Sequence, residues 1–199
     1  MQKEIKSVAF DLGGVLLFQD FSELTEEENF LFTFYMNRNK PEKMNEYYQQ
    51  FGEEKAKKIL KYAEEQMSVI YPKIHKPYKD TFQTLKVLKE EKITSSIWTN
   101  NIRVLSIVLE KLGFYDYIDP QHVINSIDFG YLKPSEGFYR YALQKTKQVP
   151  NEVLFIDDNL KNVEGARKLN IHGMHYIETE EMPLKEQTLE EIKKIEKRL

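Results

Sequence analysis

Carboxylates stand directly after two apolar runs that lie far apart in the chain. The run from Val8 to Phe10 ends at Asp11, and the run from Val153 to Ile156 ends at Asp157 and Asp158. Short apolar runs predict buried parallel strands, and open α/β sheets bind ligands at the carboxyl ends of such strands. A carboxylate held there can act as a nucleophile, as a metal ligand or as both.

Each acidic position also has a purely structural interpretation. Asp11 can end its strand in an Asx turn, and the Asp157-Asp158-Asn159 segment can cap a helix that starts at Leu160. Adjacent carboxylates at a strand end repel each other unless a cation is present, and this favours a metal site. Capping and metal binding are compatible with each other.

Two further segments carry polar groups at positions where a phosphate could bind. The run Ser95–Asn101 predicts a strand that ends in hydroxyl and amide groups. There the Thr99 hydroxyl and the Asn100 backbone N–H could hold phosphate oxygens, helped by the positive end of the following helix; the alternative is that Thr99 is a plain helix cap. Lys133 stands before a helix-initiating proline, and on its own it is an ordinary surface lysine.

The order Asp, Thr, Lys, Asp-Asp resembles the four motifs of the haloacid dehalogenase-like (HAD) hydrolase superfamily, from about Ser7 to Tyr176. Phe-Asp-Leu-Gly-Gly-Val-Leu together with Ile-Asp-Asp-Asn-x-x-Asn-Val looks most like small phosphatases with a helical cap. That subgroup includes bacterial sugar-1-phosphate phosphatases and the N-terminal domain of soluble epoxide hydrolases. The resemblance implies Mg²⁺-dependent hydrolysis of a small phosphorylated metabolite, for example a sugar phosphate, through an aspartyl-phosphate intermediate.

The resemblance also assigns roles to individual residues. It makes Asp11 the nucleophile and Lys133 the residue that neutralises charge on the nucleophile and the phosphate. It assigns the phosphate to Thr99 and Asn100. It assigns Mg²⁺ to Asp11, the backbone carbonyl of Gly13 and Asp158, with Asp157 in a supporting position and Asn162 orienting Asp158.

Gly13 departs from the superfamily pattern, because most of its phosphatases carry a second Asp two residues after the nucleophile. That Asp protonates the leaving oxygen and later activates water, a contribution worth roughly 10²–10⁴-fold. Three interpretations stay open: a cap residue, a water or Asp20 takes over; the substrate has a leaving group that needs little protonation; or the protein is a weak enzyme or a binding protein. A metal-independent haloacid dehalogenase is a further alternative, although the paired aspartates count against it.

The remaining chain supplies the elements that must position these residues. Helical spacing without strands over residues 20–75 predicts an α-helical cap, with Thr25 and Glu28 forming a capping box at its start. Helix starts are also expected at Pro41 and Glu53, the latter helix ending at Ile70, with a hinge over Tyr71–Pro77. Strands alternate with helices in residues 1–19 and 76–199, which predicts an α/β fold: a Rossmann-like doubly wound parallel sheet with the cap inserted.

Several details inside these elements are also predicted. The helix after the second strand is expected from Asn101 to Leu112, the last strand from Gly173 to Ile177 and the terminal helix from Gln187 to Leu199. Trp98 is expected to pack under a helix rather than to contact substrate. The cluster Lys73, His75, Lys76 and Lys79 is expected to be a solvated hinge, with phosphate attraction as the alternative, and His172 and His175 are not expected to form a metal site.

Composition limits the function further. The chain has 199 residues, a net charge of −3, no cysteine and 41% hydrophobic residues. These values predict a folded core, no cysteine-based metal site and a reducing, cytoplasmic location. The sequence shows no signal-peptide pattern, no run near the roughly 20 apolar residues that span a bilayer and no basic stripe for nucleic acid. We therefore expect a small-molecule phosphorylated substrate, no membrane or nucleic-acid partner, and a monomer or weak homodimer.

Overall fold

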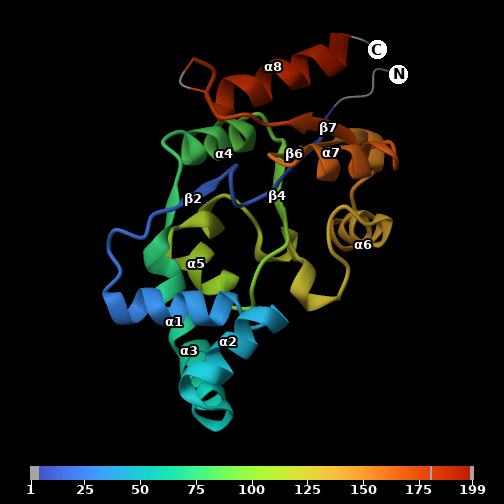
Figure 1. Ribbon diagram of the computed structural model, residues 1–199. Helices are drawn as coiled ribbons and strands as arrows, with labels where there is room; N and C mark the ends of the chain where they lie inside the picture. Colours follow the sequence, from blue (N-terminus) through green and yellow to red (C-terminus); the bar gives the residue numbers. More distant parts are fainter. Residues whose placement is uncertain (1–4, 180, 198–199) are drawn as a thin grey trace. The chain divides into compact units, whose positions relative to one another are not determined.

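The computed structural model describes residues 5–179 and 181–197 (Figure 1). It divides into two compact units. One unit is formed by residues 19–76, and the other by the chain before and after them. The second unit contains the sheet, and the first is helical, so the expected α/β fold with a helical insertion near the N-terminus is confirmed.

The sheet has five parallel strands in the order β5-β4-β1-β6-β7. The strands are β1 (Ser7–Phe10), β4 (Thr94–Thr99), β5 (Val123–Asn125), β6 (Val153–Asp157) and β7 (His172–His175). After β1 the chain fills one side of the sheet with β4 and β5, then returns to the other side with β6 and β7. The central β1 therefore lies where the strand order reverses, which is where ligands bind in doubly wound sheets.

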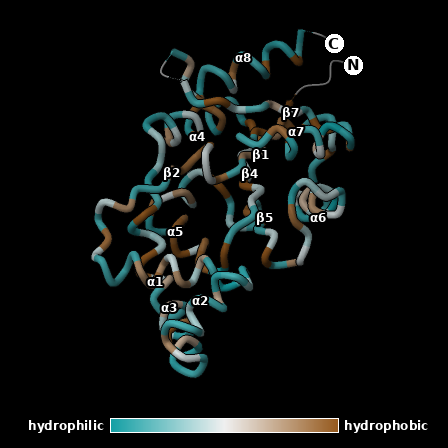
Figure 2. Tube along the Cα trace, in the orientation of Figure 1, coloured by the Kyte–Doolittle hydropathy of each residue, from teal (hydrophilic) through white to brown (hydrophobic). Residues whose placement is uncertain are grey.

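Helices cover both faces of this sheet. They are α4 (Thr81–Glu90), α5 (Leu105–Lys111), α6 (Glu136–Thr146), α7 (Leu160–Arg167) and α8 (Leu184–Lys197). Helices α6 and α7 contact each other, as do α4 and α8. Helix α8 alternates hydrophilic and hydrophobic stretches (Figure 2), and its Leu184, Ile192 and Ile195 are buried.

Trp98 lies in the core on the α6 side of the sheet. It is fully buried with Tyr139 of α6 and Phe155 of β6, whose rings lie 6.4 and 5.7 Å from its own. The interpretation of Trp98 as a packing residue is therefore confirmed. Because side chains alternate along a strand, this burial directs Ile97 to the opposite face and Thr99 to the same face as Ile97.

The insertion consists of α1 (Glu26–Met36), α2 (Pro41–Phe51) and α3 (Glu53–Ile74). The capping box is confirmed: the Glu28 N–H donates to the Thr25 hydroxyl, and the Thr25 N–H donates to the Glu28 carboxylate. Phe34 is the centre of a small core in which its ring stacks on Tyr47 at 4.0 Å. Two short strands, β2 (Leu17–Gln19) and β3 (His75–Pro77), pair where the chain enters and leaves the insertion.

The expected hinge from Tyr71 to Pro77 is wrong in its first half, because α3 continues through Pro72 to Ile74. Pro72 lies in the last turn of the helix, where its missing N–H removes a single hydrogen bond. The expected solvated character of this cluster is also wrong for His75, which is buried. The Lys73 ammonium pairs with Glu28 at 2.5 Å and the Lys76 ammonium with Glu23 at 2.7 Å.

Other boundaries differ from expectation. Helix α5 begins at Leu105 rather than Asn101. Before it, the Asn125 side chain accepts from the Asn101 N–H and donates to the Ile102 carbonyl, which also accepts from the Leu105 N–H at 3.3 Å. Strand β7 ends at His175 rather than Ile177, and α8 begins at Leu184 rather than Gln187. The expected helix end at Leu199 lies outside the described residues. Within the described part of the chain, each helix is too short or too polar to cross a bilayer.

His75 makes the stability of the insertion depend on pH. Burial lowers the pKa of its imidazole, against a smaller opposing effect of the hydrogen bond between Nδ1 and the Tyr71 carbonyl. In the unfolded chain a histidine protonates near pH 6.5. Between that pH and the lower pKa of the folded state, the unfolded chain binds more protons, so stability falls as the pH falls through this window.

We therefore predict that the wild type loses more unfolding free energy between pH 7.5 and pH 5.5 than His75→Gln, by up to about 1.4 kcal/mol per pH unit. Glutamine keeps a donor for the Tyr71 carbonyl but does not titrate. The measurement is urea unfolding followed by far-UV circular dichroism at both pH values. Equal pH dependence in the two proteins would contradict the prediction.

Candidate active site

The register of the central strands brings the two acidic segments together. Strand β1 pairs with β6 so that Phe10 lies opposite Ile156, and the Asp11 N–H then donates to the Ile156 carbonyl at 2.8 Å. Asp11 and Asp157 therefore lie side by side at the carboxyl edge of the sheet. The two strands are apolar runs of similar length, as buried parallel strands usually are. Because each run is followed by an aspartate, their parallel pairing places the two carboxylates next to each other.

Lys133 joins these two carboxylates. Its Nζ lies 2.8 Å from Asp11 Oδ1 and 2.7 Å from Asp157 Oδ2, and its side chain is 1% exposed. The ammonium also lies 5.4 Å from the centre of the Phe155 ring. A lysine buried this completely is favourable only when its charge is paired, and here two carboxylates pair with it.

Asp157 is fully buried, and its carboxylate is saturated with donors. Oδ1 accepts from the Asn159 N–H at 2.8 Å and from Asn162 Nδ2 at 3.0 Å; Oδ2 accepts from Asn162 Nδ2 at 3.0 Å and from Lys133. The expectation that Asn162 orients Asp158 is therefore wrong, because its amide holds Asp157. The Tyr139 hydroxyl in turn donates to the Asn162 carbonyl at 2.6 Å.

Asp158 is exposed, in contrast to its neighbour. Its carboxylate packs directly against Gly14, where an added Cβ would collide with it, and Gly14 has a φ of +79°. Only glycine meets both requirements without strain. A Cβ added at Gly13, in contrast, would have no atom within 4 Å. A side chain therefore fits at this position.

The three aspartates form one cluster. One carboxylate oxygen from each of Asp11, Asp157 and Asp158 lies within 4.8 Å of the others. Oxygen donors of this kind suit Mg²⁺, which needs only one or two carboxylates and keeps several waters. Because the oxygens of Asp157 are already occupied by protein donors, Asp11 and Asp158 are the two carboxylates that fit a metal.

The electrostatics of the cluster are unfavourable to a third negative charge. Burial raises the pKa of Asp11, the Lys133 ammonium opposes this increase, and the charge on Asp157 adds to it. Asp158 is exposed as a residue, but its carboxyl group is partly desolvated where it packs against Gly14; this desolvation raises its pKa, and the charge on Asp11 adds to the increase. Three carboxylates share one ammonium here, so a bound cation would stabilise the ionised forms of both Asp11 and Asp158.

Thr99 and Asn100 lie at the same edge, at the end of β4. Thr99 is 2% exposed, and Asn100 is exposed. The expected helix N-terminus beside them is displaced, since α5 begins five residues after Asn100. The expected help from a helix dipole at this position is therefore not available.

The Asn100 side chain contacts Lys133 in a way that was not predicted. Its Oδ1 accepts from the Lys133 N–H at 3.0 Å, and its Nδ2 donates to the Lys133 carbonyl at 3.2 Å. Both hydrogen bonds hold the peptide that carries the buried ammonium. The asparagine after the strand was the available signal, because such side chains often bond to backbone groups, but the sequence did not indicate its partner.

His175 is a second residue at this edge whose contact was not predicted. Its Nε2 lies 2.9 Å from the Asp158 carbonyl oxygen. Strand β7 pairs with β6 so that His175 lies opposite Asp157, which explains the proximity. The predicted strand, Gly173 to Ile177, included His175, but the sequence did not indicate this contact.

Comparisons with known proteins agree with this arrangement. A match of 97 residues to bifunctional epoxide hydrolase 2 of Rattus norvegicus is 29% identical, and it covers 45% of this chain and 17% of the rat protein. The chain thus corresponds to a small part of that relative.

Two solved structures share the fold. A HAD phosphatase from Thermococcus onnurineus superposes with a TM-score of 0.60 at 21% identity, covering 84% of each chain. The L-2-haloacid dehalogenase of Xanthobacter autotrophicus, solved with chloropropionic acid covalently bound, gives a TM-score of 0.53 at 21% identity, covering 85% of this chain and 76% of that one.

The family comparison covers most of the chain. A family model described as haloacid dehalogenase-like hydrolase matches residues 14–175. The match includes Lys133 and the Asp157-Asp158 pair, and the fold and the acidic edge of the sheet are those that the four motifs predicted. The protein therefore belongs to the haloacid dehalogenase-like hydrolases.

Proposed function

We propose that this protein is a Mg²⁺-dependent phosphatase that acts on a small phosphorylated metabolite through an aspartyl phosphate. The observation that supports this most is the excess of negative charge at the sheet edge. Three carboxylates face one buried ammonium. A site built for a neutral or halogenated substrate has no need of the third carboxylate, Asp158, whereas a site for a divalent cation and a phosphate does.

Asp11 and Asp158 are the residues that would hold the cation, with the Gly13 carbonyl as a third ligand implied by the family. When bound, Mg²⁺ would supply the positive charge that lets a carboxylate approach a phosphate dianion. Asp157 has a different part in this proposal, because four protein hydrogen bonds occupy its oxygens. It fixes the position of the Lys133 ammonium.

Asp11 is the nucleophile in this mechanism. One oxygen of its carboxylate attacks phosphorus, the bond from phosphorus to the leaving oxygen breaks, and the leaving oxygen takes a proton from water. A second water then attacks the aspartyl phosphate, which releases inorganic phosphate and restores Asp11. Lys133 holds Oδ1 of the nucleophile throughout, and Thr99 and the Asn100 N–H bind phosphate oxygens at the same edge.

The absence of a side chain at Gly13 limits which esters react well. No carboxylic acid stands at this position to protonate the leaving oxygen, so leaving groups that are stable as anions have the advantage. Anomeric sugar phosphates and acyl phosphates have such leaving groups, and simple alkyl phosphates do not. We therefore propose the first two as the substrate class.

The first prediction of the proposed function concerns the metal. EDTA should abolish hydrolysis of acetyl phosphate and sugar 1-phosphates, and added Mg²⁺ should restore it. Asp158→Asn should weaken Mg²⁺ binding, measured by calorimetry, by more than roughly 100-fold, the upper end of losses at supporting positions around metals. Glu164→Gln, an exposed change on α7, is the matched control and should bind Mg²⁺ normally.

Two results would redirect the assignment. Activity on 2-haloacids that survives EDTA would replace the phosphatase by a dehalogenase using the same nucleophile. Absence of turnover on the whole panel, with Mg²⁺ present and no difference between wild type and Asp11→Asn, would identify a binding protein.

The second prediction concerns Gly13. Gly13→Asp should raise turnover of simple alkyl phosphates by up to roughly 10²–10⁴-fold and raise turnover of sugar 1-phosphates less, because the new carboxyl group supplies the proton that poor leaving groups lack. The variant should fold normally, since the space at this Cβ is open. Gly14→Ala is the contrasting control and should lose activity through its collision with Asp158. Equal or lower turnover of both ester classes by Gly13→Asp would refute this account.

The third prediction concerns Asn100 as a positioning residue for Lys133. Asn100→Ala removes two hydrogen bonds of about 1 kcal/mol each, so kcat should fall roughly 5–30-fold, while KM changes little. Asn100→Asp keeps an acceptor for the Lys133 N–H and should fall between the wild type and the alanine variant. A rise in KM at unchanged kcat would instead assign the side chain to substrate binding.

A further inference from the structure

Tyr78 is fixed to the turn that follows β1. Its N–H donates to the Leu16 carbonyl at 3.2 Å, and the centre of its ring lies 5.3 Å from that of Phe18. The same turn contains Gly14, against which the Asp158 carboxylate packs. Tyr78 therefore lies beyond the carboxyl end of β1, on the turn that contacts Asp158.

Glu178 lies beyond the carboxyl end of β7. Just before it, the Tyr176 N–H donates to the Asp157 carbonyl at 3.0 Å. The Ile177 carbonyl accepts from the Gln187 side chain at 2.9 Å. These two hydrogen bonds hold the chain beside the end of β6, and Glu178 follows directly as an exposed residue.

These two residues meet across the end of β6. The Tyr78 hydroxyl forms a hydrogen bond with the Glu178 carboxylate, and both residues belong to the unit that contains the sheet. Because β6 lies between β1 and β7, a bond from the turn after β1 to the segment after β7 passes the end of β6, where Asp158 stands. In agreement with this position, burial and Glu178 raise the pKa of the Tyr78 hydroxyl, and the charge on Asp158 adds to the increase.

The pair offers hydrogen-bond acceptors beside Asp158. The phenol stays protonated at neutral pH, and its single proton is used in the bond to Glu178. A phenol oxygen accepts as well as donates, and a carboxylate has two accepting oxygens. The Tyr78 oxygen and the second oxygen of Glu178 are therefore suited to a ligand that donates protons.

A purely structural use of the pair, as a latch between two segments, adds little. Each segment is already held by hydrogen bonds of its own, at Leu16 and at Tyr176 and Ile177. A hydrogen bond to an exposed carboxylate contributes little net stability, because water competes for the same oxygens. Its place beside the acidic cluster gives the pair another use.

We propose that Tyr78 and Glu178 are positioning residues of the cation site, where they accept hydrogen bonds from the waters that Mg²⁺ keeps. The inference rests on the cation site of the proposed function, in which Asp11 and Asp158 hold the ion. Mg²⁺ retains several waters when two carboxylates bind it, and these waters need acceptors. Thr99 ends β4, on the far side of β1 from β6, so the proposed phosphate site and the pair lie on different sides of the ion.

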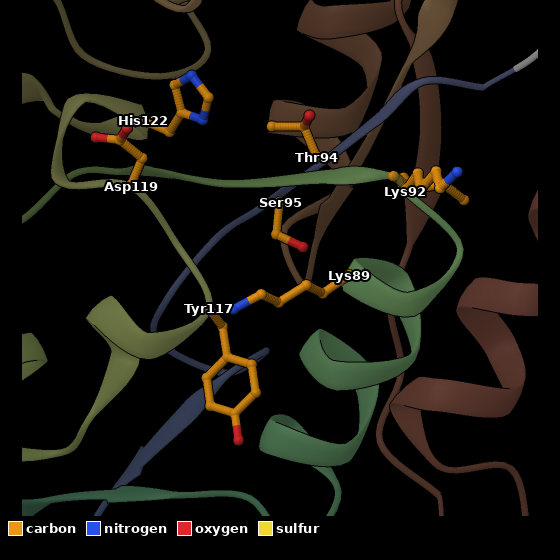
Figure 3. A pocket seen from close by; sticks show the side chains of 8 residues that line it. Lys89, Lys92, Thr94, Ser95, Tyr117, Asp119 and His122 are labelled. Carbon is orange, nitrogen blue, oxygen red and sulfur yellow. The ribbon is translucent and has the colours of Figure 1, made fainter.

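The opposite edge of the sheet supplies a matched control. Figure 3 shows Asp119 in a hollow beside the start of β4. Strand β4 runs from Thr94 in this hollow to Thr99 at the carboxyl edge, a separation of about 17–20 Å. Asp119→Asn removes one negative charge there, and asparagine keeps an acceptor for the Gln121 N–H that Asp119 caps.

The test is calorimetric titration of the whole protein with Mg²⁺ and, separately, with Ca²⁺. Tyr78→Phe and Glu178→Gln should each weaken Mg²⁺ binding by roughly 10–100-fold, the usual loss for supporting partners around a metal. Ca²⁺ binding should weaken less, because the coordination shell of Ca²⁺ is flexible whereas that of Mg²⁺ is a strict octahedron. Asp119→Asn should bind both cations as the wild type does.

The melting temperature in EDTA separates binding from folding. Both variants should keep the wild-type value, because phenylalanine retains the ring contact with Phe18 and Glu178 is exposed. If the two residues act as one pair, the double variant should bind Mg²⁺ about as tightly as the weaker single variant. Losses that multiply in the double variant would refute the pair.

The remaining outcomes distinguish this inference from the proposed function. A wild type that binds no Mg²⁺ would overturn both. Loss of Mg²⁺ binding in Asp158→Asn, with normal binding in Tyr78→Phe and Glu178→Gln, would overturn the inference and leave the cation site in place. Equal losses for Mg²⁺ and Ca²⁺ would also overturn it, since a general effect on the site would then explain them.

Discussion

The buried ammonium of Lys133 is the interaction on which the carboxyl edge of the sheet depends. Two carboxylates touch it, and its side chain is almost completely removed from water. A charge buried in this way is tolerable only with partners in good geometry, and removal of one partner leaves the others uncompensated. Asp11, Asp157 and Lys133 therefore form a unit in which no member can be replaced independently of the other two.

The parallel sheet makes this crowding unavoidable. Strands β1 and β6 are hydrogen-bonded neighbours, so the residues at their ends lie within about one strand spacing of each other. Asp158, the third aspartate of the cluster, lies against the turn after β1. Gly14 in that turn has no side chain, so the Asp158 carboxylate packs against its backbone. Repulsion among the three groups is built into the topology, and it is relieved either by positive charge or by protonation of a carboxylate.

The sequence predicted those features that arise from strand ends and motif order. The two acidic strand tips, the helical insertion and the buried position of Trp98 follow from apolar runs, helical spacing and alternation, which are local properties. The partners of Asn100, Asn162 and His175 could not be predicted in this way. Each bonds to a residue on a different element or loop, and residue spacing does not specify which of several polar groups a side chain reaches.

The start of α5 shows the same limit at the level of backbone structure. Residues 101–104 continue the helical pattern in the sequence, but the helix begins only at Leu105. The Asn125 side chain from β5 bonds to the Asn101 N–H and to the Ile102 carbonyl in the segment before it. Its effect is visible only when β4 and β5 are placed side by side.

The Asp157-Asp158 pair shows how one short segment supplies two different functions. Asp157 turns inward, is fully buried and accepts four hydrogen bonds, whereas Asp158 is exposed and packs against Gly14. The inner carboxylate is fixed by its donors, and the outer one is open to solvent. Gly13 contributes no acid at this edge, where three carboxylates lie beside one buried ammonium, and this is why the proposed substrates are those whose leaving group needs little protonation.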